Sequence, residues 1–106
     1  MITEFKYFRD GKLIILSEKE KETYEPILIS TVENFKDVWP KVGDLLEVVQ
    51  GPLISQKIYF CGVSLSLNIN SPSFPELRYL CRRNFDYSND CEVFIPVQGQ
   101  SKKVWH

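Results

Sequence analysis

Alternating hydrophobic and polar positions predict β-strands near the N-terminus and in the middle of the chain. Two runs rich in aromatic and β-branched residues flank Asp10-Gly11. Asp-Gly supplies the positive φ angles that a two-residue type I′ turn requires, so residues 5–16 are expected to form a β-hairpin. The longest alternation covers residues 57–70, where apolar side chains recur at every second position from Tyr59 onward. It predicts a long strand with one apolar face.

The other face of that long strand carries only small polar residues. They are Gly62, Ser64, Ser66, Asn68 and Asn70. A parallel strand buried on both faces would be apolar throughout, so this alternation favours an antiparallel sheet with one solvated face. Small side chains leave the backbone accessible, and either a binding partner or another layer of the fold could cover them.

Proline and charge place a third strand at a sheet edge. Residues 18–22 alternate glutamate with lysine, which is typical of a solvated turn. The apolar residues from 24 to 29 are interrupted by Pro26, which lacks the N–H that a central strand donates. Weaker patterns predict a strand at residues 44–49 and a final strand at 91–97, where Pro96 again indicates an edge.

Two capping motifs predict two short helices. Ser30 and Glu33 have the spacing of a capping box, and apolar residues follow at helical intervals until Pro40. A second box begins at Ser73, and it predicts a helix with Cys81 on its apolar face.

These elements predict an α+β domain over residues 1–98. We expect a mainly antiparallel sheet of about five strands with two short helices packed on one face. The 106 residues of the chain suit a single domain. Residues 99–106 are expected to form a C-terminal tail that could dock on the domain.

Charge and cysteine content restrict the classes of function. The 14 acidic and 13 basic residues give a net charge of -1, which disfavours non-specific binding to nucleic acid. The N-terminal segment lacks the basic and apolar regions of a secretory signal, and no apolar run is long enough to span a bilayer. Three cysteines cannot form a complete internal disulfide framework. We therefore expect a cytoplasmic protein with no membrane contact.

No residue pattern predicts a catalytic, cofactor or metal site. The single histidine is His106, at the chain terminus, where a general base would be poorly held. The glycines are scattered singly and form no phosphate-binding loop. The three cysteines lack the paired spacing of a zinc site. The exception is Cys81, whose neighbouring arginines would favour a reactive thiolate, although a helix C-terminus would oppose it.

Arginine and aromatic residues between positions 78 and 87 predict a contact surface, because both kinds of residue are enriched at protein interfaces. The candidate partner-binding residues are Arg78, Arg82, Arg83, Phe85 and Tyr87, with Glu20 and Glu22 as a second contact for a basic partner. RNA-binding surfaces use similar residues, but the near-neutral charge of the chain makes nucleic acid the less favoured partner.

The best-supported interpretation is a small protein-binding module that uses no cofactor. By analogy of size and composition, it resembles an inhibitor or an immunity-type protein that neutralises a toxin or an enzyme. The alternatives are a small enzyme with Cys81 as nucleophile and an RNA-binding module. An exposed edge strand could also pair two copies, so monomer and homodimer both stay open.

Overall fold

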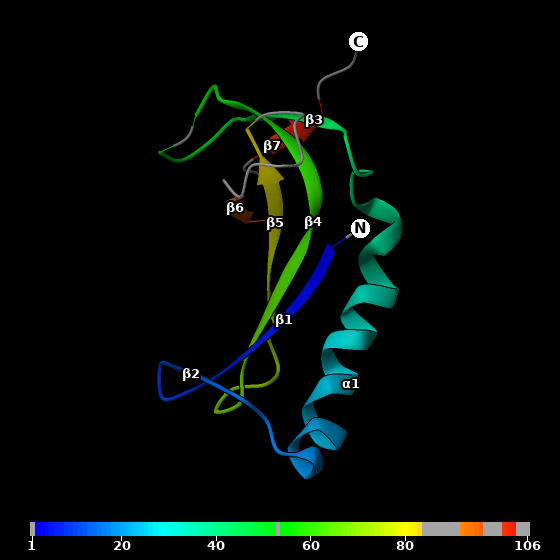
Figure 1. Cartoon of the computed structure of the whole chain (residues 1–106), viewed down its shortest axis with the longest axis vertical. Helices are drawn as coiled ribbons and strands as arrows, with labels where there is room; N and C mark the ends of the chain where they lie inside the picture. Colours follow the sequence, from blue (N-terminus) through cyan, green and yellow to red (C-terminus); the bar gives the residue numbers. More distant parts are fainter. Residues whose placement is uncertain (1, 53, 84–91, 97–100, 104–106) are drawn as a thin grey trace. The chain divides into compact units, whose positions relative to one another are not determined.

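The structure, a computed structural model, describes residues 2–52, 54–83, 92–96 and 101–103. Figure 1 shows the elements in chain order. They are β1 (Ile2–Arg9), β2 (Lys12–Ile14), α1 (Glu18–Phe35), the 3-10 helix η1 (Lys36–Val38), β3 (Leu45–Val48), β4 (Lys57–Asn68), β5 (Glu76–Arg82), β6 (Glu92–Pro96) and β7 (Ser101–Lys103).

The strands form a mixed sheet in the order β2-β1-β4-β3-β7, and β5 pairs with both β4 and β6. β1 and β4 are parallel, because partners advance together along both strands. Ile2 lies against Gly62, and further along the carbonyl oxygen of Phe8 accepts a hydrogen bond from the N–H of Ile69. The predicted antiparallel sheet with two helices is therefore wrong: the sheet is mixed, and the described residues contain one α-helix.

The chain divides into two compact units. The helix unit consists of Glu4–Trp39 and Ser64–Glu76, and the strand unit consists of Met1–Thr3, Pro40–Val63 and Leu77–His106. The helix unit contains β2, α1, η1, most of β1 and the end of β4. The strand unit contains β3, β6, β7, the first half of β4 and most of β5.

The predicted β-hairpin is confirmed. β1 and β2 pair in antiparallel fashion, with Arg9 opposite Lys12 on either side of the turn. The turn residues have positive φ angles, 52° at Asp10 and 78° at Gly11. This is the conformation that a type I′ turn needs, and it is the reason why Asp-Gly is a strong local signal.

The first helix begins at Glu18, much earlier than the predicted start at Ser30. Ser17 is the N-cap: its hydroxyl accepts the N–H of Glu20 at 3.2 Å, and the Glu20 carboxylate accepts the N–H of Ser17 at 3.1 Å. This reciprocal pair is a complete capping box. The charged stretch 18–22, predicted as a turn, therefore forms the first turns of α1.

The predicted edge strand at residues 24–29 is also wrong, because this segment lies inside α1. Its burial follows a helical period, since Tyr24, Ile27, Thr31 and Val32 are half-buried around the fully buried Leu28. Pro26 is exposed. Its ring lies on the solvated side of the helix. Proline has no N–H to donate to the carbonyl group one turn earlier, and on this side water can hydrate that carbonyl instead.

The two serines that could cap α1 give a direct test of where the helix starts. We expect Ser17→Ala to lower the free energy of unfolding by about 1 kcal/mol, because the N–H of Glu20 loses the hydroxyl that caps it. The matched control is Ser30→Ala. Ser30 is exposed in the helix interior, so alanine there should stabilise the protein by about 0.5 kcal/mol. Urea denaturation measures both, and a larger loss at Ser30 would contradict this helix boundary.

The second predicted helix is a strand. Residues Glu76–Arg82 form β5, which pairs with β6 in antiparallel fashion and places Tyr79 opposite Ile95. In the strand unit, the Tyr79 ring meets the ring of Phe60 edge to face, with centroids 5.1 Å apart. Leu77, Tyr79 and Cys81 alternate along this segment as a strand requires. The apolar residues of this segment fit the period of a helix as well as that of a strand, and packing against the neighbouring strands favours the strand.

The long strand predicted at residues 57–70 and the strand predicted at 44–49 are confirmed as β4 and β3. The solvated face that was expected for the long strand is not confirmed. Gly62 and Ser64 are buried, and Ser66 is half-buried. Within the segment predicted as a tail, Ser101–Lys103 forms β7 and pairs with β3.

Candidate functional site

The arginines of the predicted contact surface lie in a strand. Arg78 and Arg82 occupy alternate positions of β5 with the buried Leu80 between them, and both arginines are half-buried. Arg78 stands opposite Pro96 of the neighbouring strand β6. They therefore belong to a paired strand, not to the helix that the sequence predicted for this segment.

The rest of that predicted surface is only partly described. Arg83 follows β5 and is exposed. Phe85 and Tyr87 lie outside the described residues, so their contribution stays a prediction.

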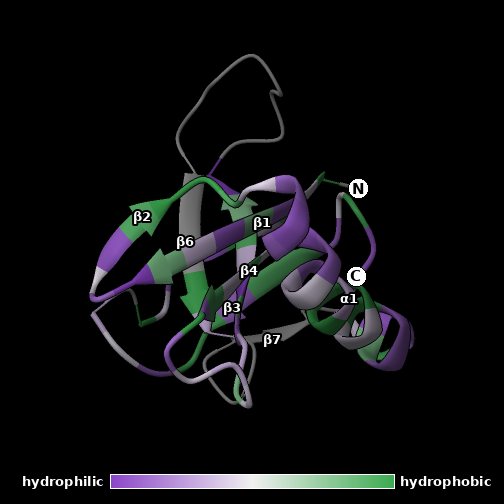
Figure 2. Ribbon diagram, turned by 90° about the horizontal axis from the view of Figure 1, so that it is seen from below, coloured by the Kyte–Doolittle hydropathy of each residue, from purple (hydrophilic) through white to green (hydrophobic). Residues whose placement is uncertain are grey.

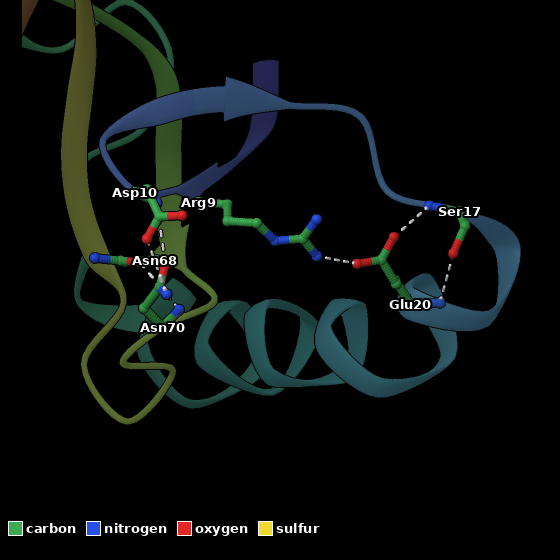
Figure 3. Close-up of polar contacts among 6 residues, drawn as sticks. All are labelled: Arg9, Asp10, Ser17, Glu20, Asn68 and Asn70. Carbon is green, nitrogen blue, oxygen red and sulfur yellow. Dashed lines mark hydrogen bonds and ion pairs between the residues drawn. The ribbon is translucent and has the colours of Figure 1, made fainter.

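Glu20 and Glu22, the predicted second contact, differ in their surroundings. The Glu20 carboxylate accepts the N–H of Ser17 and forms an ion pair with Arg9 of β1 (Figure 3). The hydrogen bonds from Ser17, followed by the contact with Arg9, hold the pKa of Glu20 below its usual value. Glu22 is exposed. Glu20 therefore joins α1 to the hairpin, and Glu22 is the one left on the surface for a partner.

A second polar contact fixes the hairpin turn of the helix unit (Figure 3). The N–H of Asp10 donates to the side-chain oxygen of Asn70 at 3.0 Å, and the Asn70 amide nitrogen donates to the Asp10 carboxylate at 3.3 Å. The N–H of Asn70 in turn donates to the side-chain oxygen of Asn68 at 3.0 Å. These bonds join the turn to the end of β4, so they have a structural role.

The two described cysteines lie in the strand unit and are buried. Cys61 is in β4, and Cys81 is in β5 with none of its surface exposed. Burial, with a smaller contribution from the charge of Cys61, raises the pKa of Cys81 to about 12. A thiol with this pKa is protonated at neutral pH and has no access to solvent, which weighs against Cys81 as a nucleophile. Cys91 lies outside the described residues.

The β-hairpin has one face toward α1 and one face away from it. On the first face, Arg9 pairs with Glu20, and burial together with the nearby Glu25 carboxylate raises the pKa of Tyr7. Tyr7 stands opposite Ile14. Because strand side chains alternate, Ile14 and Leu16 point to the same side as Tyr7, which agrees with the burial of Leu16.

The face of the hairpin away from α1 carries exposed apolar side chains. Phe8 stands opposite Leu13, and Ile15 follows on the same side. Leu13 is 65% exposed and Ile15 is 95% exposed, whereas Phe8 is half-buried beside them. We refer to Phe8, Leu13 and Ile15 as the hairpin patch. Figure 2 shows the hydrophobic colour of β2, which is the last strand at one end of the sheet order.

The hairpin patch was not predicted, although the sequence contains a signal for it. Residues 13–16 are Leu-Ile-Ile-Leu, an uninterrupted apolar run beside a tight turn. A strand that begins at such a turn must direct alternate side chains to opposite faces. With only one face covered by the helix, two of these four residues have to be exposed.

Comparisons with known protein families, with curated proteins and with solved structures found no match. The described part of the chain contains no helix that is long and apolar enough to cross a membrane. The cysteine and acidic side chains of the described residues form no group of three that could hold a metal ion.

Proposed function

We propose that the chain is a protein-binding module and that the hairpin patch is its contact surface. The observation that carries the proposal is the exposure of Leu13 and Ile15, 65% and 95%, the first on the last strand of the sheet order and the second directly after that strand. Edge strands of proteins that remain unassociated are usually protected by charged residues or proline at outward positions. Here the outward position of β2 carries Leu13, and the exposed Ile15 follows directly after the strand.

The backbone of β2 supports the same surface. In a hairpin with a two-residue turn, the pair that flanks the turn exchanges hydrogen bonds, and so does every second pair beyond it. Arg9–Lys12 and Tyr7–Ile14 are these pairs. The N–H and C=O of Leu13 therefore point away from β1. A partner that adds a strand here would gain backbone hydrogen bonds and apolar contacts together.

This proposal moves the contact surface away from the arginine-rich segment. Arg78 and Arg82 are half-buried within the sheet, whereas Leu13 and Ile15 of the hairpin patch are exposed. That the chain is an inhibitor or an immunity-type protein that neutralises a toxin or an enzyme stays a prediction from size and composition.

The test compares two double variants of the tagged full chain in capture from lysate of its source cell. Leu13→Lys/Ile15→Lys charges the hairpin patch. Val38→Lys/Phe74→Lys is the matched control, because these side chains are 74% and 88% exposed in the same unit. Quantitative mass spectrometry after nuclease treatment should show a protein that the wild type and the control retain and that the hairpin variant loses by at least about tenfold.

Retention of the same proteins by the hairpin variant would overturn this contact surface. Circular dichroism of each variant provides the folding control. All four substituted positions are exposed, so the thermal midpoints of both variants should stay close to that of the wild type.

A further inference from the structure

The outer edge of β2 offers a short, well-delimited segment for strand pairing. Among the described residues, β2 pairs only with β1. On the turn side, Gly11 has a φ of 78°, which is not an extended conformation. On the other side, Ser17 caps α1, and its N–H is already bonded to Glu20. β2 itself covers Lys12–Ile14, and Ile15 and Leu16 lead from it to this cap, so the segment available for pairing runs from Lys12 to Leu16.

A second copy of the chain fits this edge in one register. If two β2 strands pair in antiparallel fashion about a two-fold axis at Ile14, Leu13 of each copy stands opposite Ile15 of the other. The most exposed apolar side chains then cover one another, and their outward backbone groups exchange hydrogen bonds. An axis at Leu13 would place Ile15 opposite Gly11, and an axis at Ile15 would place Leu13 opposite Ser17, which the turn and the helix cap disfavour.

The charges agree with this register. Lys12 of one copy stands opposite Leu16 of the other, close to the first turn of that copy's α1. In this turn the Glu18 side chain is 93% exposed, and its carboxylate lies 3.5 Å from Nζ of Lys21. No like charges stand directly opposite each other in this register. The segment is self-complementary, as a two-fold interface requires.

We infer that the chain forms a two-fold homodimer through antiparallel β2–β2 pairing centred on Ile14. This inference rests on the proposed function, because it names the partner of the same hairpin patch. The contact involves a few side chains and one short strand from each copy. It is smaller than the roughly 1,200 Å² of a stable interface, so monomer and dimer should be in a concentration-dependent equilibrium.

Sedimentation velocity from micromolar to millimolar protein measures this equilibrium. We expect the wild type and Phe74→Lys to associate with rising concentration. The Leu13→Lys/Ile15→Lys variant should associate at least about tenfold more weakly, because lysines would then face one another across the axis.

Cross-linking tests the register itself. Ile14 lies on the axis as a non-hydrogen-bonded pair with its copy, where Cα atoms are about 4.5 Å apart, within the range for a disulfide. In a glutathione buffer, Ile14→Cys should form a covalent dimer, whereas the wild type and Phe74→Cys should not. Phe74 is 88% exposed, so a cysteine at this position controls for cross-links that form by random collision.

The results separate this inference from the proposed function. A chain that stays monomeric at every concentration, with no Ile14→Cys cross-link, overturns the dimer. If the hairpin variant nevertheless loses a captured protein, the binding function stands and the partner is a different protein. If the hairpin variant loses nothing, both proposals fail.

Discussion

Replacing Gly62 with alanine is expected to lower the free energy of unfolding by about 3 kcal/mol or more. An added Cβ would lie 2.7 Å from the carbonyl carbon of Ile2 and 2.8 Å from its Cβ, with the Ile2 carbonyl oxygen closer still. These are mainly backbone atoms, which cannot move aside as the end of a flexible side chain can. β1 would have to separate from β4, and the parallel pairing near Ile2 would be lost. Urea denaturation followed by circular dichroism measures the change.

Ser66→Ala is the matched control for this prediction. Ser66 lies on the same strand and the same face as Gly62 and is half-buried. Alanine there adds no atoms, so the loss should stay within about 1 kcal/mol. If Gly62→Ala were no more destabilising than Ser66→Ala, β1 would not lie against β4 at this point.

The close approach at Gly62 explains why the sequence analysis misjudged the long strand. Small polar residues at alternate positions were expected to form a solvated face. In the structure, Gly62 accommodates a neighbouring backbone, and Ser64 is buried. A small residue is compatible with solvent and also with a close neighbour. Polarity alone could not separate the two, and the strand that fills the space is far away in sequence.

Local signals predicted the parts of the fold that local chemistry determines. The Asp10-Gly11 turn and the alternation along β4 depend on neighbours in sequence, and both are confirmed. The parallel pairing of β1 with β4 joins residues separated by β2, α1 and β3. No short-range pattern reports such a contact, because loop closure and packing of the whole chain decide it.

The start of α1 could have been predicted. Tyr24, Ile27, Leu28, Thr31 and Val32 follow a helical period, and Ser17 and Glu20 form a capping box before them. Pro26 favoured a strand over a helix for this segment, because a proline in the interior of a helix is normally destabilising. Its exposed position in α1 removes most of that objection. The face on which a proline lies thus matters as much as its presence.

The candidate site shows the same limits. Arginine and aromatic residues identified a surface by composition, but Arg78 and Arg82 became half-buried once the segment formed β5. The hairpin patch has an ordinary composition. What distinguishes it is its place on the last strand of the sheet order, which only the fold reveals.

Replacing Leu28 with alanine should lower the free energy of unfolding by about 3 kcal/mol, within the range measured for leucine in protein cores. Leu28 is the only described residue of α1 that is fully buried. Truncation therefore removes the main apolar contact of the helix and leaves a cavity that rigid neighbours fill poorly. Thermal and urea denaturation measure the loss.

The neighbouring isoleucines make this prediction a test of the helix. Ile27 is half-buried and Ile29 is 46% exposed. In a helix they point in different directions, so Ile27→Ala should cost more than Ile29→Ala, for which less than about 1 kcal/mol is expected. In a strand they would share one face and give equal losses. Equal losses at both positions would therefore support the edge strand that the sequence suggested, whereas a graded series with Leu28 highest, Ile27 intermediate and Ile29 lowest requires the helical packing of α1.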